Sequence, residues 1–405
     1  MQKILTKNFS NPDSHKLETA KANGAYSSLE KLKKLSPAQV IEEIIASELR
    51  GRGGAGFLTG QKWSFVPQNS GLPTYLIVNA DEGEPGTFKD RAILEKDPHL
   101  LIEGIIIAAH AIQAKTVYVY FRGEYYQQWQ IFLTALEEAR QDGLLLDLII
   151  ITHRGAGAYI CGEETALLNS LEGKRGLPRS KPPYPASQGL FNAPTVVNNV
   201  ETLANLPFII NQGAKAFTKI GTKESKGTKL ISVCGHINCP GVYEIEMGLP
   251  LATFLAEYAG GTIEERPIKA VFPGGISSPI LTAQETLRTN ISYESLRAAG
   301  SMLGSGGMIV IDESYLMSEI LHDVAKFFQH ESCGQCTPCR EGTGWVYKIA
   351  QKIRQGYASN KDLDLLLELA DNMQGKTICV FADALAMPLR SLVTKFRDEL
   401  KIHIK

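Results

Sequence analysis

Four cysteines near the carboxyl end constrain this chain more than any other feature. Cys333, Cys336 and Cys339 are each separated by two residues, and Cys379 follows Cys339 by 40 positions. Three thiolates at this spacing can reach three corners of a cubane iron–sulfur cluster, and the remaining corner needs a ligand that the fold returns from farther along the chain. The spacing therefore favours a cubane cluster on Cys333, Cys336, Cys339 and Cys379.

Zinc is the alternative metal for these cysteines. Structural zinc usually takes two separated C-x2-C pairs, whereas this chain offers one triplet and a lone partner. Disulfides are disfavoured because seven cysteines are an odd and modest number for 405 residues, which is typical of a reducing compartment such as the cytoplasm. The other three cysteines lack a second cysteine at metal-ligand spacing and are interpreted as small core or loop residues: Cys161, Cys234 and Cys239.

Composition places the chain among ordinary globular proteins of several domains. Hydrophobic residues make up 44% of it, and 42 basic residues against 43 acidic ones leave a formal charge of -1. This balance gives no reason to expect nucleic acid or an anionic bilayer as a partner. The apolar runs at 105–112 and 144–151 are far shorter than the roughly 20 residues of a membrane span. The first thirty residues are polar and carry acidic side chains, unlike a targeting segment. Membrane contact is expected only through partners.

Strands and helices alternate through the first part of the chain. Ser36 and Gln39 form a capping box around Pro37, and apolar residues at helical spacing then run towards Gly51. Strands are predicted at 75–79, 116–121 and 146–152, with helices from Asp97–Pro98 and over 125–140. This rhythm predicts an α/β fold with a Rossmann-like parallel sheet, helices on both faces and a ligand outside the carboxyl ends of the strands.

The remainder changes character twice. The tract 173–207 is dense in Pro, Gly and Asn and is predicted to be a long structured loop that binds a ligand. Short strands near 230–234, 242–246 and 270–272 and a helix over 251–258 predict a small α+β domain. Helices are then expected near 315–330, 341–355, 361–374 and 383–401, around the cysteines. The predicted division is an N-terminal helical segment (1–50), an α/β domain (51–228), a small α+β domain (229–312) and a four-helix iron–sulfur domain (313–405).

Two glycine-rich segments are candidates for binding phosphate or a flat ring. The first carries glycines at 51, 53, 54, 56 and 60, followed by Lys62. It is no Walker A motif, and it follows a helix, so the dinucleotide fingerprint fails as well; a bland mobile loop is the alternative. The second, 155–162, leaves the third strand and enters a helix near Glu163 and Glu164. Those two carboxylates either cap the helix or accept hydrogen bonds from a ligand.

Polar residues also follow predicted strand ends. Asn79, Asp81, Glu82 and Glu84 come directly after the strand at 75–79, where ligand contacts are expected in parallel sheets. Hydrogen bonds to polyol hydroxyls explain them better than a Mg²⁺ site, for which no kinase or phosphatase signature exists. Uncharged donors and acceptors recur at Asn198, Asn199 and Thr202. Neither G-x-S-x-G nor H-E-x-x-H occurs, so nothing points to a hydrolase.

Five segments taken in order resemble one family. They are residues 50–57, 79–91, 155–166, 194–202 and 331–342, and together they closely resemble the NADH-binding flavoprotein subunits of respiratory complex I. The resemblance extends over nearly the whole chain from about residue 20. Diaphorase subunits of NAD-dependent hydrogenases and formate dehydrogenases share these motifs. Many of those are fused to thioredoxin-like or ferredoxin-like modules, for which 405 residues leave no room.

The resemblance implies FMN between the two glycine-rich segments, with NADH stacked on the flavin. The implied FMN contacts are Gly51, Gly53, Gly54, Lys62, Asn79, Asp81, Glu82, Tyr159, Glu163, Glu164, Asn198, Asn199 and Thr202. The implied NADH contacts are Gly56, Phe57, Gly60, Phe65, Glu84, Lys181 and Tyr184. Relatives often carry phenylalanine where this chain has Tyr184, and stacking remains expected there. The middle domain is similar to the β-grasp type of the family.

The implied activity is NADH dehydrogenation within complex I. NADH passes a hydride to FMN, and single electrons then pass to a [4Fe-4S] cluster, to partner subunits and to quinone. No side chain is needed as a proton donor for the first step, although Glu163 or Glu164 is a candidate for tuning the flavin. The implied partners are a thioredoxin-like [2Fe-2S] subunit and a multi-cluster iron–sulfur subunit, on the cytoplasmic side of a bacterial inner membrane. The alternatives are a hydrogenase or formate dehydrogenase diaphorase and, from another class, a zinc-stabilised scaffold without flavin.

Overall fold

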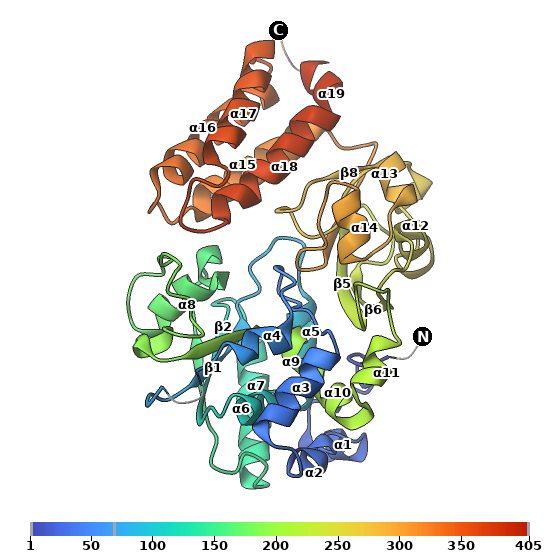
Figure 1. The fold of residues 1–405 in the computed structure, drawn as a ribbon. Coiled ribbons are helices and arrows are strands. Elements are labelled where there is room, and N and C mark those ends of the chain that lie inside the picture. Colours follow the sequence, from blue (N-terminus) through green and yellow to red (C-terminus); the bar gives the residue numbers. More distant parts are fainter. Residues whose placement is uncertain (1–2, 68–69, 403–405) are drawn as a thin grey trace.

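The computed structural model describes residues 3–67 and 70–402, which form three parts (Figure 1). A parallel sheet with its helices makes up the lower part in the figure, a mixed sheet lies beside it, and a helical bundle stands above both. Ahead of the parallel sheet come α1 (Leu17–Ala22), α2 (Ser28–Leu32), α3 (Pro37–Ala46) and α4 (Thr59–Ser64). The predicted capping box of α3 is present, because Ser36 and Gln39 bond each other's backbone.

The parallel sheet confirms the predicted α/β fold class. Its strands are β1 (Tyr75–Ala80), β2 (Thr116–Phe121), β3 (Ile149–Arg154) and β4 (Thr195–Asn199), all parallel in the order β3-β2-β1-β4. The order reverses next to β1, and at this switch point Asn79 lies opposite Asn199. Switch points are where open α/β sheets bind ligands. The helices of this part are α5 (Lys89–Lys96), α6 (Pro98–Ala111), α7 (Tyr126–Gln141), α8 (Glu164–Leu171), α9 (Val200–Ala204), α10 (Leu206–Gln212) and α11 (Ala214–Thr218).

The prediction of one long loop over 173–207 was wrong in part. The tract contains β4 and α9, and α10 begins at its end. Thr195, Val196 and Val197 are β-branched and buried, as a central strand requires, but the strand spans only five residues and Pro194 precedes it. The surrounding Pro, Gly and Asn therefore masked it in the sequence. Asn198 and Asn199 consequently lie at a strand end rather than on a loop.

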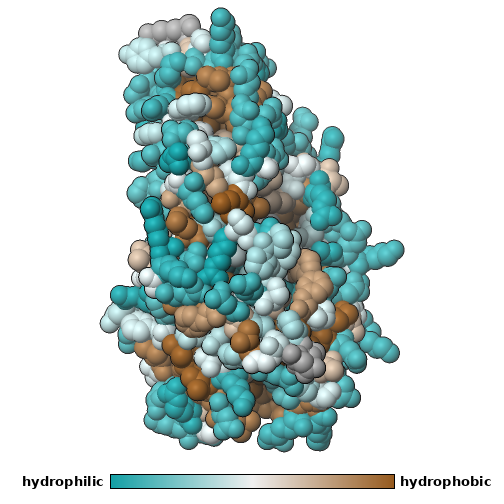
Figure 2. Space-filling model, turned by 60° about the vertical axis from the view of Figure 1, so that its left-hand side comes forward, coloured by the Kyte–Doolittle hydropathy of each residue, from teal (hydrophilic) through white to brown (hydrophobic). Residues whose placement is uncertain are grey.

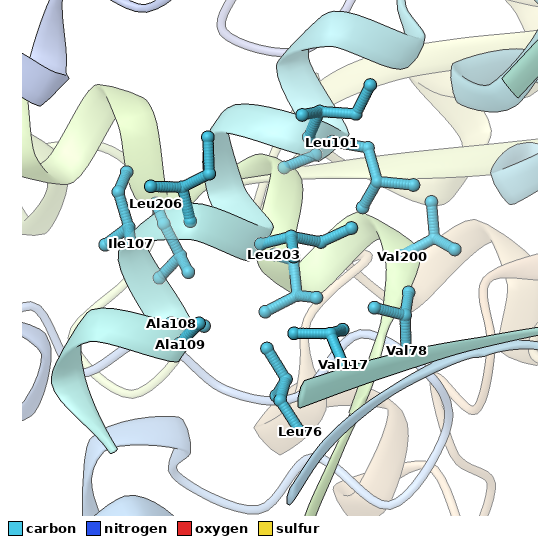
Figure 3. Close-up of a cluster of buried hydrophobic side chains, with 14 of the residues drawn as sticks. Leu76, Val78, Leu101, Ile107, Ala108, Ala109, Val117, Val200, Leu203 and Leu206 are labelled. Atoms are coloured by element: carbon cyan, nitrogen blue, oxygen red, sulfur yellow. The ribbon is translucent and has the colours of Figure 1, made fainter. Parts of the chain in front are cut away.

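Helices pack on both faces of the parallel sheet. On one face Leu76, Val78 and Val117 point towards α6 and α9 (Figure 3). A Cβ on Gly104 of α6 would lie 2.2 Å from the carbonyl oxygen of Leu203, so glycine permits the close approach of these two helices. On the other face Ile77 joins a cluster that contains residues of α8. Burial of this kind stabilises the fold by about 1.5–3 kcal/mol for each large side chain, and it fixes the strand ends that carry the polar residues.

The middle part is a mixed five-stranded sheet, which confirms the small α+β domain. Its strands are β5 (Thr228–Gly235), β6 (Gly241–Glu246), β7 (Ile268–Phe272), β8 (Leu281–Thr282) and β9 (Gly307–Asp312), in the order β6-β5-β9-β7-β8. Its helices are α12 (Leu251–Thr253), which continues into a π-helical turn at Phe254–Tyr258, α13 (Ala283–Arg288) and α14 (Tyr293–Ala298). This part has a hydrophobic cluster of its own, so its strands and helices pack mainly against one another.

The carboxyl-terminal part is helical as predicted. It comprises α15 (Met317–Glu331), α16 (Thr337–Arg354), α17 (Asn360–Met373), α18 (Phe381–Lys395) and the short α19 (Arg397–Ile402). The predicted start of α16 at 341 was wrong, because the helix begins at Thr337 with Pro338 in its first turn, where a missing N–H breaks no helical hydrogen bond. Cys336 is therefore the N-cap and Cys339 lies in the first turn. The cysteine triplet therefore spans a loop and the start of a helix.

The surface carries no single large apolar face in the view of Figure 2, where hydrophobic side chains are exposed in separate patches among hydrophilic ones. Across residues 3–67 and 70–402, every helix is too short or too polar to cross a lipid bilayer.

Candidate functional site

The candidate site lies where the carboxyl ends of β1 and β4 meet the second glycine-rich segment. Asn79 joins two of these elements: its side-chain Nδ2 donates to the carbonyl of Gly162 at 2.9 Å, and its Oδ1 accepts from the backbone N–H of Asp81 at 3.0 Å. A Cβ on Gly162 would approach the carbonyl of Asp81 at 3.4 Å. Asn79, Asp81 and the 155–162 segment are therefore brought together, as predicted from their positions at strand ends.

The first glycine-rich segment forms a closed loop between α3 and α4. Arg50 and Leu58 form an antiparallel bridge, and the N–H of Gly51 donates to the carbonyl of Phe57 at 2.8 Å. The N–H of Arg52 donates to Thr202 Oγ1 at 2.8 Å, which ties the loop to α9. Gly54 has φ +142° and open space where a Cβ would stand. The loop is thus anchored at its base and open at Gly54, which is the form that a ring or a phosphate needs.

Three aromatic side chains predicted to line the nucleotide site are exposed. Phe57 and Phe65 have relative exposures of 48% and 55%, and their ring centroids lie 6.3 Å apart. Tyr184 is 61% exposed. Exposed rings with free faces are suited to stacking on a flat base. Gly60 has a different role, because its Cβ position lies 2.5 Å from the backbone nitrogen of Ile45 and the residue is buried against α3.

Two lysines and two glutamates form a chain at the start of α8. Lys62 Nζ donates to Glu164 Oε2 at 3.0 Å, and Lys181 Nζ donates to Glu164 Oε1 at 2.7 Å and to Glu163 Oε1 at 3.1 Å. Burial would raise the pKa of Glu164, but the two lysines outweigh it and lower that pKa to about 2. Glu163 Oε2 accepts from the N–H groups of Thr165 and Ala166 at 2.8 and 2.9 Å. The capping interpretation of Glu163 is confirmed, and Glu164 is a fixed anion beside Lys62 and Lys181.

Asp81 and Glu82 point in different directions. Asp81 Oδ2 is buried without a hydrogen-bond partner, and burial raises the pKa of this carboxyl to about 7. The Glu82 carboxylate instead accepts from the N–H groups of Asp90 and Arg91 at 2.9 and 3.0 Å and from the Tyr125 hydroxyl at 2.9 Å. Glu82 thereby caps α5, while Asp81 retains an oxygen that a ligand donor can satisfy.

Glu84 is held by two different parts of the molecule. Its carboxylate accepts from the Tyr159 hydroxyl at 2.6 Å and from the N–H and hydroxyl of Ser277 at 2.9 and 2.8 Å. Burial raises the pKa of Glu84. Tyr159 and Glu84, predicted for the flavin and nucleotide respectively, are therefore direct neighbours. Ser277 belongs to the mixed-sheet part, and no sequence pattern marked it.

The asparagines at the end of β4 use their side chains for local structure. Asn198 Oδ1 accepts from Trp63 Nε1 at 2.9 Å, which fixes α4 against the sheet. Asn199 Oδ1 accepts from the N–H of Glu201 at 3.0 Å and caps α9. A Cβ on Gly53 would lie 3.0 Å from the Cβ of Asn199, so the loop passes directly over this residue. Asn198 and Asn199 therefore lie at the candidate site, as predicted, and their side chains hold α4, α9 and the glycine-rich loop in place.

A buried charge cluster behind the glycine-rich loop escaped sequence reasoning. Glu201 Oε2 lies 2.5 Å from Lys229 Nζ and 2.9 Å from Lys89 Nζ, and all three side chains are buried. Burial opposes ionisation of Glu201, but Lys229, Lys89 and Arg52 together lower the pKa of its carboxyl. Lys89 lies within the segment 79–91, but nothing in the sequence distinguishes it from a surface lysine. The cluster joins α5 and α9 to β5 of the mixed sheet.

The four predicted cluster ligands gather at one end of the helical part. Cys333, Cys336 and Cys379 pack against the hydrophobic cluster that contains Cys339. Cys336 Sγ accepts from the N–H of Ile378 at 3.4 Å, which brings the 376–380 segment to the triplet. Burial, with a smaller contribution from the nearby Glu163, Cys333 and Cys339, raises the pKa of Cys379 to about 12. Thiolates in this setting need cations to stabilise them, which a metal centre supplies.

The cysteines are not grouped as a zinc ion requires. Zn–S bonds of 2.3 Å in a tetrahedron place the sulfurs about 3.8 Å apart. Within the described residues, no three His, Cys, Asp or Glu side chains are positioned for a single metal ion.

Aromatic side chains connect the two sites. The Tyr159 ring contacts Phe327 of α15 and Phe381 of α18, with centroids 5.2 and 5.8 Å apart. The N–H of Tyr159 donates to Glu331 Oε2 at 3.0 Å, two residues before Cys333. The turn at Tyr159 is thus packed directly on α15 and α18, the two helices that flank the segments with Cys333 and Cys379.

Comparisons with known proteins agree with this arrangement. Residues 44–208 match the family described as Nuo51 FMN-binding domain, 229–309 match the SLBB domain, and 319–403 match the NADH-ubiquinone oxidoreductase-F iron-sulfur binding region. The chain is 49% identical over 411 residues to the second F subunit of the NADH-quinone oxidoreductase of Rhizobium meliloti (strain 1021), covering 99% of this chain and 97% of that protein. It is 46% identical to the NADH-quinone oxidoreductase F subunit of Rickettsia bellii (strain OSU 85-389), covering 98% of each.

Solved structures with the same fold come from an NAD⁺-reducing [NiFe]-hydrogenase. Its H2-reduced form aligns with a TM-score of 0.89 at 37% identity, and its air-oxidised form with 0.87 at 39%. The chain spans 67% and 66% of those two solved chains. The relatives, the FMN-binding match and the iron–sulfur match place the chain among complex I subunits, which have other subunits as partners. The chain belongs to the family of the F subunits of NADH-quinone oxidoreductase.

Proposed function

We propose that FMN binds between the loop 51–60 and the segment 155–162, and that NADH stacks against it beside Phe57, Phe65 and Tyr184. As an F subunit, the chain oxidises NADH through FMN and a [4Fe-4S] cluster. One observation carries the residue-level proposal: the glycine-rich loop passes directly over Asn199 at the end of β4, and the adjacent strand β1 is followed by Asp81 with its unpartnered oxygen.

The proposed FMN site combines residues that contact the ligand with residues that shape the site. Asn79, Asp81 and the backbone of Gly51, Gly53 and Gly54 contact the ligand, and Lys62 beside Glu164 supplies the positive charge that a phosphate needs. Four further predicted residues act mainly by shaping the site through the bonds described above: Glu82, Glu163, Asn199 and Thr202. Asn198 and Tyr159 complete the proposed set, and Glu164 is proposed to set the local charge next to the flavin.

Positioning is the proposed catalytic contribution of the protein. Bound FMN accepts a hydride from NADH and releases electrons singly, which is the chemistry of the cofactor. Glu84 and Lys181 are proposed to bind the nicotinamide nucleotide with Gly56 and Gly60 shaping the loop. The Tyr159 hydroxyl and Ser277 hold the Glu84 carboxylate in place, so its orientation does not need to be fixed again when NADH arrives.

We further propose Cys333, Cys336, Cys339 and Cys379 as the four cluster ligands. The gathering of the four thiols beside Tyr159 supports this assignment, because a cluster there lies next to the flavin site. Among complex I subunits, the proposed partners are a thioredoxin-like [2Fe-2S] subunit and a multi-cluster iron–sulfur subunit, on the cytoplasmic side of the membrane. The division at residues 50, 228 and 312 is proposed as the domain organisation. The SLBB match and the iron–sulfur match fall within the last two domains, and the FMN-binding match begins at residue 44, before the first boundary.

The proposal is tested by anaerobic purification followed by analysis of FMN, iron and acid-labile sulfide. One FMN and four irons for each chain are expected, and NADH is expected to bleach both chromophores while NADPH is not. A colourless protein without flavin or sulfide contradicts the proposal and favours the zinc-stabilised scaffold.

A diaphorase role in a soluble hydrogenase is the second candidate, favoured by the TM-score of 0.89 to the hydrogenase chain. The coverage of 97% of a complex I subunit, against 67% of the hydrogenase chain, favours complex I. Copurification of a tagged chain distinguishes them, because complex I brings down quinone-reducing activity and a hydrogenase brings down nickel.

A further inference from the structure

The mixed-sheet part contacts the glycine-rich loop through the side chain of Tyr293. Tyr293, the first residue of α14, donates its hydroxyl hydrogen to the carbonyl oxygen of Gly51 at 3.1 Å. A Cβ on Gly56 would lie 2.8 Å from the Tyr293 ring, and Gly56 has φ +66°. The ring therefore occupies the space in which any other residue at position 56 would carry its side chain.

Arg50 completes the contact from the other side of the loop. Its guanidinium lies 5.4 Å from the centre of the Tyr293 ring, within the range of a cation–π interaction. Arg50 Nη1 donates to the carbonyl of Gly56 at 3.2 Å, and Nε donates to the carbonyl of Glu224 at 3.2 Å. The start and the end of the loop are thus both tied to the residues that surround Tyr293.

Tyr293 is itself held in place by the segment 222–225 and by the neighbouring Glu294. Its backbone N–H donates to Ser225 Oγ at 3.0 Å, and the Ser225 hydroxyl donates to Glu294 Oε2 at 2.6 Å. Glu294 Oε1 accepts from the Thr222 hydroxyl at 2.6 Å. The ring that meets the loop is therefore presented from a fixed network rather than from a mobile side chain.

We propose that Tyr293 is a positioning residue, which holds the loop 51–57 in the shape that presents Phe57 to the nicotinamide nucleotide. The inference rests on the proposed placement of NADH beside Phe57. It gives the middle domain a role in the reaction, because that domain supplies the side chain that orders the loop before the nucleotide binds. A loop ordered in advance improves nucleotide binding more than the rate of the bound complex.

The test uses the full chain with its FMN and cluster in place and compares Tyr293→Phe with Tyr243→Phe. Tyr293→Phe removes the hydroxyl bond to Gly51 and keeps the ring. Tyr243 is the matched control, because its hydroxyl donates to the Cys239 carbonyl at 2.9 Å in the same domain, away from the loop. Two quantities are measured: amide hydrogen exchange of a peptide covering 51–58, and KM and kcat for NADH with an artificial one-electron acceptor.

The expected result for Tyr293→Phe is faster exchange in the loop and a KM for NADH that rises roughly 2- to 10-fold, as the loss of one hydrogen bond predicts, while kcat changes by less than about twofold. Gly56→Ala, which forces a methyl group against the ring, is expected to change the same two quantities in the same direction. Unchanged loop exchange, an unchanged KM, or an equal effect of Tyr243→Phe overturns the proposal. Loop exchange reports on Tyr293 whether or not NADH bleaches the wild-type protein, so this inference and the proposed function fail separately.

Discussion

The backbone N–H of Tyr159 donates a hydrogen bond of 3.0 Å to the carboxylate of Glu331. Tyr159 belongs to the turn beside the flavin site, and Glu331 ends α15 two residues before Cys333. This single bond joins the proposed electron donor site to the loop that carries the cluster ligands. Because the acceptor is charged and partly buried, the bond stabilises the junction more than an ordinary surface contact.

Glu331→Ala is expected to loosen this junction. Loss of a hydrogen bond to a charged group removes about 1.5–3 kcal/mol of local stabilisation, so hydrogen exchange at residues 159–162 rises and the cluster is lost faster in air. Glu341→Ala is the control, since Glu341 is exposed and pairs only with the neighbouring Arg340 at 2.9 Å. Equal exchange and equal iron retention in the two variants contradict the structural role of Glu331.

FMN binding is expected to depend on pH through Asp81. Burial raises the pKa of this carboxyl from the ordinary value of 3.8 to about 7. In the folded protein without ligand, Asp81 therefore stays protonated up to a pH of about 7. A hydroxyl or ring N–H of FMN that donates to the carboxylate favours the ionised form, and binding then releases a proton. As the pH increases towards about 7, the affinity for FMN increases by up to tenfold for each pH unit, and above pH 7 it levels off. Fluorescence titration of the flavin-free protein between pH 5.5 and 8.5 measures this, and Asp81→Asn flattens the curve. If the affinity of the Asp81→Asn variant for FMN changes with pH as in the wild type, Asp81 is not the group responsible.

Glu201→Ala is expected to destabilise the protein strongly. It leaves Lys229 and Lys89 buried without their carboxylate, and removing one partner of a buried ion pair typically reduces stability by about 3–5 kcal/mol. Glu137→Ala is the control, because its pair with Arg140 is exposed and is worth about 0–1 kcal/mol. The check is the midpoint of urea unfolding followed by tryptophan fluorescence, and similar midpoints for the two variants contradict the importance of the buried cluster.

Removal of the distant cysteine is expected to remove the cluster selectively. Cys379→Ser deprives the triplet of its fourth thiolate, so the iron and sulfide content after anaerobic gel filtration falls well below that of the wild type while FMN is retained. Cys239→Ser is the matched control, because Cys239 is free and exposed. Wild-type iron content in Cys379→Ser shows that another group completes the cluster.

Local patterns predicted much of the fold. Residues 116–121 are predominantly β-branched and aromatic, and β2 has the predicted bounds. The helix from Asp97–Pro98 was found because its cap and its proline are local signals, and Asp97 does accept from the N–H of Leu100. The cysteine spacing and the polar residues after β1 could be interpreted for the same reason, since short spacings within one segment determine what those residues reach.

What the sequence did not reveal depends on contacts between distant segments. β4 lacked a pattern of its own because five residues between Pro194 and an asparagine pair give too short a signal. Glu201 and Lys229 are 28 positions apart, and neither differs in sequence from a solvated charge. Tyr293 meets Gly51 across 242 positions, so no local pattern connects them. Such residues are recognised only when the fold has placed them together.

Electrons are proposed to pass from NADH to FMN and from FMN to the cluster. Removal of the flavin tests this order. The wild-type protein, the flavin-free protein and the flavin-free protein with FMN restored are each treated anaerobically with NADH, and the electron paramagnetic resonance signal of the reduced cluster is recorded, with dithionite as the reference. NADH is expected to produce the signal only when FMN is bound, whereas dithionite is expected to produce it in all three samples. An equal NADH-induced signal in the flavin-free protein would mean that electrons reach the cluster without FMN.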